Sequence, residues 1–166
     1  MLPLERDLPD PPNGLAFEDV SLEFVKLIPA FPEQELVPYY HFKVVNNHGL
    51  EVGHISLRIG DNEHITVYVG HIGYTILPRF RGNHYAYKAC RALAPFAVTL
   101  FCQVIITCNP DNWPSIKTIE KLGAVYLGTV KVPPHDRAYQ GGARVKRRYE
   151  WNLKEPVDKP QELAQH

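Results

Sequence analysis

The most informative segment of the chain spans residues 70–86 and reads Gly70-His71-Ile72-Gly73-Tyr74-Thr75-Ile76-Leu77-Pro78-Arg79-Phe80-Arg81-Gly82-Asn83-His84-Tyr85-Ala86. Its pattern predicts a strand that leads through a turn at Gly82 into a helix. The first amides of a helix have no partner within it, and the helix dipole adds partial positive charge there. Such a helix start binds phosphate, and Gly82 permits a backbone path that points several N–H groups inward. Arg79 and Arg81 flank this predicted phosphate site.

Hydrophobic patterning around this segment predicts an α/β fold with a mixed sheet. We expect antiparallel strands first and then the order strand–helix–strand–helix–strand–strand, with one parallel crossover near the sheet centre. The predicted strands are residues 20–27, 39–45, 52–59, 65–77, 104–108, 124–132 and 144–153, and the predicted helices run from 85 to about 100 and from 112 to 122. Within the strand 65–77, Gly70 and Gly73 indicate a bulge or a close backbone approach.

Length and composition are those of one globular domain. The chain has 166 residues, of which 45% are hydrophobic and 22% are charged. These values exclude a disordered chain, a collagen and a coiled coil, and the length matches one domain. The proline-rich start predicts a flexible N-terminal tail over residues 1–16. We expect a single domain over 17–153 and a polar C-terminal tail over 154–166.

The charges balance overall but are unevenly distributed. Eighteen basic residues match eighteen acidic ones, so no global field points to nucleic acid. No acidic residue occurs between Glu63 and Asp111, whereas that stretch contains Arg79, Arg81, Lys88 and Arg91. A cationic middle suits a compact polyanion such as a phosphorylated cofactor. The alternative is that strands and core helices simply lack carboxylates.

The cysteines and the hydropathy indicate a reduced protein of the cytoplasm. Cys90, Cys102 and Cys108 are odd in number and lack metal-ligand spacing, so we expect neither a disulfide framework nor a bound metal. The first fourteen residues contain no apolar run typical of a signal peptide. No run of about 18 apolar residues exists, so we expect no contact with a membrane.

Two motifs in this order resemble the GNAT superfamily of acyl-CoA-dependent N-acyltransferases. Arg79-x-x-Gly82-x-His84 matches the pyrophosphate loop of that superfamily, except that His84 stands where Gly or Ala is usual. The following Tyr85-Ala86 also fits the pattern. The backbone N–H at His84 survives the substitution, although the imidazole needs space.

The second motif lies downstream, after a buried apolar strand. It consists of Asn112-x-x-Ser115 followed by Glu120-Lys121-Leu122-Gly123. The resemblance covers roughly residues 20–153 and is strongest to a group of small bacterial predicted acetyltransferases. It implies a mostly antiparallel sheet with a central, splayed pair of parallel strands, and acetyl-CoA as cosubstrate.

The resemblance also implies where that cosubstrate binds. Pantetheine would lie between the splayed strands and pair with the backbone of Ile76 and Leu77. The pyrophosphate would be surrounded by Arg79, Arg81, Gly82, Asn83, His84 and Tyr85, and Asn112 and Ser115 would contact pantetheine from the second helix. Either Lys88 or Lys117 would reach the outer phosphate.

The implied reaction is direct attack of an amine on the acetyl thioester. It requires that the amine lose a proton, that the oxyanion be stabilised and that the thiolate leave. The N–H near Ile76 would serve the oxyanion. His71 is the best local base, because its reference pKa is about 6.5. Glu51, Glu63 or a water relay remain alternatives, and His71 as a packed, hydrogen-bonded side chain is another.

The general acid is less well defined. Many members of the superfamily place a tyrosine seven residues after the asparagine, but that position is Ile119 here. We take Tyr126 as the candidate acid, with Tyr139 or solvent as alternatives. Tyr74 is interpreted mainly as core or pocket wall, and Cys108 as the end of a buried strand.

The sequence therefore predicts an N-acetyltransferase acting on a primary amine. The acceptor is a small amine, a peptide N-terminus or a lysine, and Glu33 and Glu35 either attract a cationic amine or form a solvated loop. Lys146-Arg147-Arg148 is interpreted as a solvated or substrate-side face, not as a nucleic-acid patch. A homodimer is compatible with the sequence. The alternatives are a non-catalytic acyl-CoA sensor or scaffold, and an interaction domain without a cofactor.

Overall fold

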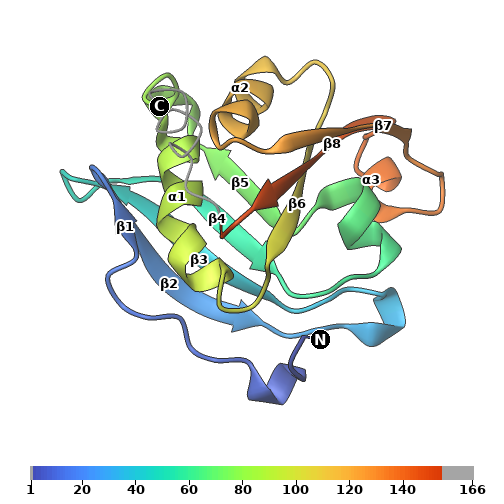
Figure 1. Cartoon of the computed structure of the whole chain (residues 1–166), viewed down its shortest axis with the longest axis horizontal. Helices are drawn as coiled ribbons and strands as arrows, with labels where there is room; N and C mark the ends of the chain where they lie inside the picture. The colour runs from blue at the N-terminus through green and yellow to red at the C-terminus, as the bar shows by residue number, and fades with distance from the viewer. Residues whose placement is uncertain (1, 155–166) are drawn as a thin grey trace, which may run out of the picture.

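The chain forms two antiparallel sheets that diverge from each other (Figure 1). The computed structural model describes residues 2–154. The larger sheet has the order β1-β2-β3-β4-β5, and its strands are β1 (Ala16–Phe17), β2 (Val20–Ile28), β3 (Tyr39–Asn46), β4 (Glu51–Arg58) and β5 (Ile72–Ile76). The smaller sheet has the order β6-β8-β7, from β6 (Gln103–Cys108), β7 (Val125–Lys131) and β8 (Val145–Asn152). The predicted α/β class with mostly antiparallel strands is confirmed.

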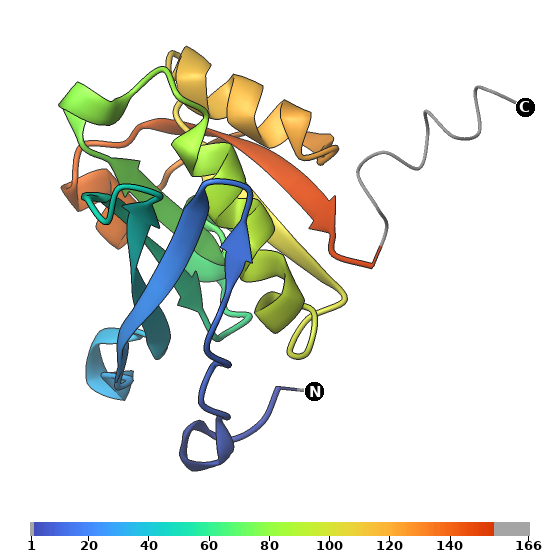
Figure 2. The ribbon, with the colours of Figure 1, turned by 90° about the vertical axis from the view of Figure 1, so that its left-hand side faces the viewer.

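Within residues 2–154, three α-helices connect or cover the sheets. They are α1 (Tyr85–Ala97), α2 (Trp113–Lys121) and the short α3 (Arg137–Gln140). Helix α1 packs on β1, β2, β4 and β5, and α2 packs beside it (Figure 2). Helix α3 lies in the segment between the predicted strands 124–132 and 144–153, and Asp136 caps it by accepting from the N–H of Ala138.

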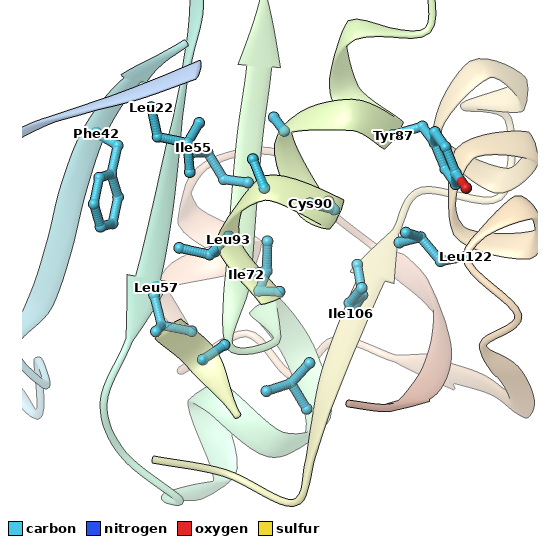
Figure 3. Close-up of a cluster of buried hydrophobic side chains, with 14 of the residues drawn as sticks. Leu22, Phe42, Ile55, Leu57, Ile72, Tyr87, Cys90, Leu93, Ile106 and Leu122 are labelled. Atoms are coloured by element: carbon cyan, nitrogen blue, oxygen red, sulfur yellow. The ribbon is translucent and has the colours of Figure 1, made fainter. Parts of the chain in front are cut away.

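The core lies between α1 and the two sheets. Figure 3 shows Leu93 of α1 near Ile55 and Leu57 of β4, with Ile106 of β6 on the other side. These four side chains are at most 1% exposed. Because the α1 side chains fill the space where the sheets part, the helix fixes the two sheets relative to each other.

The sheets meet at a seam between β5 and β6. One bridge, Gly70 to Ile106, joins the two sides, and the N–H of His71 donates to the carbonyl of Ile105 at 2.7 Å. No strand ladder joins β5 and β6 within residues 2–154. Figure 3 draws the two arrows pointing the same way from this junction and separating. A gap between strands therefore opens next to the predicted cofactor loop.

The predicted strand 65–77 is wrong in its first half. Residues His64–Val69 form a π-helical segment, and β5 begins only at Ile72. The side chain of Asn62 accepts from the N–H of Ile65 at 3.0 Å, and its carbonyl accepts from the N–H of Thr66 at 2.9 Å. Gly70, at φ +78°, then reverses the chain. Capping by Asn62 thus overrides the strand propensity of this β-branched segment.

The structure describes nearly all of the predicted N-terminal tail but little of the predicted C-terminal one. Residues 2–16 lie against the larger sheet, because Tyr40 donates to the carbonyl of Pro9 at 2.5 Å and Glu5 accepts from the N–H of Ala30 at 2.9 Å. Whether residues 1–16 are flexible stays a prediction. Of the predicted polar tail 154–166, all but residue 154 lies outside the described residues. No helix among residues 2–154 is long and apolar enough to cross a bilayer.

Candidate active site

A cleft of about 670 Å³ opens where β5, the β5–α1 loop and the first turns of α1 and α2 come together. Its lining contains aromatic, small and basic side chains but no aspartate or glutamate. The lining residues are Tyr74, Thr75, Ile76, Phe80, Arg81, Gly82, His84, Tyr85, Ala86, Tyr87, Asn112, Trp113, Pro114, Ser115, Lys117, Thr118 and Lys121. The cleft thus unites the two motifs recognised in the sequence, which lie on different elements.

The start of α1 faces this cleft without a cap. His84 occupies the cap position, and no side chain accepts from the first amides of the helix. Gly82 has φ +91° and His84 has φ +60°, so both lie in the left-handed region. A Cβ at Gly82 would meet nothing within 4 Å, so conformation rather than space favours glycine there. Glycine is usual at the position of His84 because it adopts this left-handed conformation without strain. A histidine in the same conformation costs about 1 kcal/mol.

The loop side chains divide into those that line the cleft and those that hold the loop. Arg81 lines it and donates from Nε to the carbonyl of Ile76 at 3.1 Å. Asn83 donates to the carbonyl of Phe80 at 3.0 Å, and the guanidinium of Arg79 lies 4.8 Å from the Phe80 ring centre. Neither Asn83 nor Arg79 is among the lining residues. Their geometry favours a role in shaping the loop.

The backbone of β5 offers hydrogen bonds to the gap at alternate residues. His71 accepts from Arg58, and Leu77 donates to Val52, so these odd-numbered residues face β4. In an antiparallel ladder the residues between them face the other way, which points the backbone groups of Tyr74 and Ile76 into the gap. Leu77 also accepts from the N–H of Phe80. The predicted pairing role thus fits Ile76, whose N–H faces the gap and whose carbonyl accepts from the side chain of Arg81, whereas both backbone groups of Leu77 are engaged with backbone partners.

Asn112 and Ser115 lie at the inner end of the cleft, as expected for the second motif. Asn112 caps α2 by accepting from the N–H of Ser115 at 3.3 Å. The hydroxyl of Ser115 is hydrogen-bonded to the phenol of Tyr74 at 2.5 Å. Burial raises the pKa of Tyr74 well above its usual value of 10.0. The phenol therefore stays protonated at neutral pH and is a proton donor at the seam.

Two lysines of α2 supply positive charge at the outer part of the cleft. Lys117 and Lys121 are one helical turn apart and both line it. Of the two lysines proposed for the outer phosphate, only Lys117 is in place, since Lys88 lies 2.7 Å from Asp19 and does not line the cleft. Lys121 was not predicted, although its i+4 spacing from Lys117 on a helix is the signal that points to it.

His71 lies away from the cleft, behind the seam. Its Nδ1 accepts from the N–H of Ile105 at 2.9 Å, and its ring packs on Phe101 with centroids 4.8 Å apart. Burial lowers its pKa to about 4, against a smaller opposing effect of a hydrogen bond to the carbonyl of Gly60. With both ring nitrogens engaged and no access to the cleft, His71 fits the structural alternative and not the catalytic one.

Tyr126 and the other residues proposed for proton transfer also lie elsewhere. Tyr126 is 47% exposed on β7 and is bonded to the hydroxyl of Thr129. Tyr139 lies under the guanidinium of Arg144, and Glu63 accepts from the phenol of Tyr68. None of these side chains, nor Glu51, lines the cleft. The geometry instead favours Tyr74 as the acid, a residue interpreted from the sequence mainly as core or pocket wall.

A second cavity, of about 230 Å³, lies on the other side of the Tyr74–Ser115 hydrogen bond. It shares Tyr74, Asn112 and Ser115 with the cleft, so the two spaces meet at that pair. Its other lining residues are Arg58, Val69, Ile72, Gly73, Thr107, Cys108, Asn109 and Lys146. Residues 2–154 contain no group of three or more metal-ligating side chains in either space.

Comparison with known proteins gives the same family as the motifs. The model of the acetyltransferase (GNAT) domain matches residues 18–125, which is more than half of the chain. A GNAT-family acetyltransferase from Bacillus anthracis is 28% identical, with a TM-score of 0.54 over 69% of this chain and 67% of that one. No curated protein matches the chain.

Two further solved structures share the fold at lower identity. The microcin C7 self-immunity acetyltransferase MccE, solved with acetyl-CoA and AMP, is 19% identical, with a TM-score of 0.54 over 69% of this chain and 61% of that one. RimL, a ribosomal L7/L12 alpha-N-protein acetyltransferase, is 16% identical, with a TM-score of 0.53 over 69% of this chain and 70% of that one. The chain thus spans about two thirds of the length of these structures. On the family match, this chain belongs to the GNAT family of acetyltransferases.

Proposed function

We propose that the protein transfers acetyl from acetyl-CoA to a primary amine. The observation that carries this proposal is the uncapped start of α1, whose free amides face a cleft that ends at the half-buried Tyr74 in the gap between the sheets. Acetyl-CoA fits the groups present, because its phosphates need donors and cations and the cleft lining has both and no carboxylate.

Each part of the cosubstrate has a counterpart among the lining residues. The amides from Gly82 to Ala86, with Arg81, would hold the pyrophosphate. The gap-facing backbone of Ile76 would pair with the pantetheine amides. Lys117 and Lys121 would take the outer phosphate.

Bound acetyl-CoA supplies an activated acetyl thioester. The amine nitrogen bonds to the acetyl carbon, the carbon–sulfur bond breaks, and the amine proton passes to water. Tyr74 holds a proton at Oη, oriented by Ser115, passes it to the departing sulfur and regains a proton from the water that accepted the amine proton. The N–H of Ile76, one of the gap-facing donors on β5, would stabilise the oxyanion.

No side chain of the described residues serves as an obvious base. Neither cavity lining contains a carboxylate, and the one histidine, His84, lies at the start of α1 on the cofactor side. The amine therefore reacts from its neutral form, with water taking the proton. The rate should then rise with pH up to the pKa of the acceptor amine.

The acceptor, the oligomer and the location remain proposals. Among the neighbours, RimL is named for acting on a ribosomal protein, which allows a protein acceptor as well as a small one. The edge strand β7 exposes Val125, Tyr126 and Leu127, which favours a homodimer through that edge. The three cysteines are free, as expected in the cytoplasm.

Calorimetric titration with acetyl-CoA and with CoA tests the proposal, followed by thiol release with a panel of amines. We expect micromolar binding and turnover. Gly82→Asp places a carboxylate at the phosphate site and should weaken CoA binding by at least about 30-fold. Gly142→Asp is the matched control, since Gly142 also has a positive φ and open space but lies outside the cleft.

The outcomes separate the candidate functions. Binding without turnover of any amine would favour the acyl-CoA sensor or scaffold. No binding up to millimolar concentrations would contradict both functions and leave an interaction domain. Equal affinity of the two aspartate variants would show that the phosphates bind elsewhere.

A further inference from the structure

The second cavity contains two basic side chains and no acidic one. Arg58 comes from the end of β4 and Lys146 from the start of β8, so residues distant in sequence bring the charges together. Within residues 2–154, no carboxylate lies within 4.0 Å of either cation. Both side chains are partly buried, and cations that are partly withdrawn from water normally have an anionic partner.

Arg58 is held in place by the backbone. Its Nη1 donates to the carbonyls of Val69 and Gly70 at 3.2 and 3.1 Å. Its Nη2 lies where a side chain at Gly73 would be, because a Cβ there would approach it to 2.7 Å. Gly73 thus leaves the space through which the guanidinium crosses β5. Two carbonyls share the positive charge but do not neutralise it.

Lys146 differs from the two arginines that follow it. Arg147 lies over the ring of Tyr126, and Arg148 donates to the carbonyl of Thr66 at 2.8 Å. Only Lys146 of the three lines the cavity. Burial lowers the pKa of Lys146, and the charge of Arg58 acts in the same direction. An anion between the two cations would relieve both effects.

The position of the cavity connects it to the proposed reaction. It meets the cofactor cleft at Tyr74 and Ser115, so a molecule in it lies on the side of the seam opposite the phosphate loop. An acceptor has to approach the thioester from a side that the cosubstrate does not fill. With a volume of about 230 Å³, the cavity has room for a small group rather than a folded segment.

We propose that this cavity binds an anionic group of the acceptor, a carboxylate or a phosphate, through Arg58 and Lys146. This inference rests on the proposed function and names its substrate class: a primary amine that carries an anion a few bonds away. The same two cations disfavour a second positive charge nearby, which lowers the pKa of the acceptor ammonium and favours the reactive neutral amine. Glu33 and Glu35, considered above for a cationic amine, are exposed and outside the cavity.

Matched acceptor pairs test this proposal by thiol release at saturating acetyl-CoA. The pairs are O-phosphoethanolamine with ethanolamine and β-alanine with β-alaninamide, whose members differ mainly in the anionic group. We expect the anionic member to have a kcat/KM at least about 10-fold higher in the wild type. In Lys146→Met this ratio should fall below about 3, with an unchanged Kd for CoA. Lys131→Met, on the exposed part of β7, is the control and should keep the wild-type ratio.

A second measurement tests the cavity even where the acceptor of the enzyme is not among these amines. At saturating CoA and constant ionic strength, 20 mM inorganic phosphate should raise the Tm of the wild type by about 2 °C more than that of Lys146→Met. Equal or better reaction of the uncharged amines would overturn the proposal. So would an absence of both turnover and phosphate stabilisation in a protein that binds CoA. A protein that does not bind CoA contradicts the proposed function itself, and the phosphate titration without CoA then still decides whether the cavity binds anions.

Discussion

The cofactor cleft and the cavity beyond Tyr74 share a wall but are built in different ways. The cleft takes its binding groups from two continuous segments, the β5–α1 loop and the start of α2, and many of these groups are backbone amides. The cavity takes its charges from side chains on β4 and β8, which lie almost ninety residues apart at Arg58 and Lys146. The proposed cosubstrate site thus consists mainly of local backbone, and the proposed acceptor site consists of side chains that the fold brings together.

Because of this difference, substitutions should affect the cleft and the cavity in different ways. A backbone site depends on conformation, so it is disturbed by changes in φ or by an added negative charge. A side-chain site depends on individual charges and is altered by single neutral substitutions. The four predictions that follow use this difference and run from the largest expected effect to the smallest.

The largest effect is expected at Tyr74, which lies between the cleft and the cavity. Tyr74→Phe removes the proton donor while keeping the ring, so kcat should fall by about 1000-fold with little change in the Kd for CoA. Tyr126→Phe, which alters the exposed tyrosine on β7, should keep the wild-type rate. Steady-state kinetics and calorimetry of the two variants check this. If only Tyr126→Phe lost activity, the general acid would be Tyr126 on β7, and Tyr74 would have no part in proton transfer.

His71 should matter for stability rather than for the rate. Its pKa is about 4 in the folded state and 6.5 as a reference, so between these values the unfolded chain binds a proton that the folded chain does not. The stabilisation is complete above about pH 6.5 and falls by about 3 kcal/mol as the pH drops towards 4. His71→Gln should lack this component, whereas His135→Gln, at an exposed position, should retain it.

Denaturant unfolding of the wild type and the two glutamine variants at a series of pH values measures this effect. The kcat of His71→Gln should stay within about threefold of the wild type, because the ring does not reach the cleft. If the pH–rate profile of the wild type has an inflection that is missing in His71→Gln, His71 acts as a base after all.

Substitution of a lysine of α2 should have a smaller effect, limited to the affinity for CoA. Lys121→Met should weaken CoA binding about fivefold, because one charge near a solvated phosphate contributes about 1 kcal/mol. The loss should shrink as salt is added, since the contact is exposed. Lys88→Met should leave CoA binding unchanged, because Lys88 is paired with Asp19. If Lys88→Met has the larger effect on the Kd for CoA, the outer phosphate lies over α1.

The smallest effect is expected at the unusual residue of the loop. His84→Gly should change the Kd for CoA by no more than about twofold, because the proposed contact is made by the amide and not by the imidazole. It should also raise the free energy of unfolding by about 0.5 kcal/mol through relief of the positive φ. A tenfold loss of CoA affinity would instead show that the imidazole contacts the cosubstrate.

The sequence predicts the cofactor half of the molecule well because its signals are local. The turn at Gly82 and the helix that begins near residue 112 are both set by neighbouring residues, and the structure has both where they were expected. The family follows from the same two motifs. The strands on either side were located to within a residue or two, apart from the segment before Ile72.

Most of the errors come from contacts that no local pattern contains, although the capping of Ile65 by Asn62, three residues earlier, is a local signal. The helical turn at His64–Val69 depends on the side chain of Asn62 and on the reversal at Gly70. The roles of Arg58 and Lys146 depend on how four strands meet. His71 has the reference pKa of a base, but its placement against the amide of Ile105 buries the ring, which lowers its pKa to about 4. Long-range placement, rather than residue type, separates a catalytic group from a structural one here.

The seam between the sheets has a consequence for solubility. The edges of β5 and β6 face each other with a single bridge between them, so the molecule contains two strand edges that lack neighbours. Unpaired strand edges are templates for aggregation, and most proteins cover theirs permanently. Acetyl-CoA in the proposed site would lie in the gap between these edges. We therefore expect the supply of acetyl-CoA in the cell to set how much of this protein stays soluble, quite apart from how fast it works.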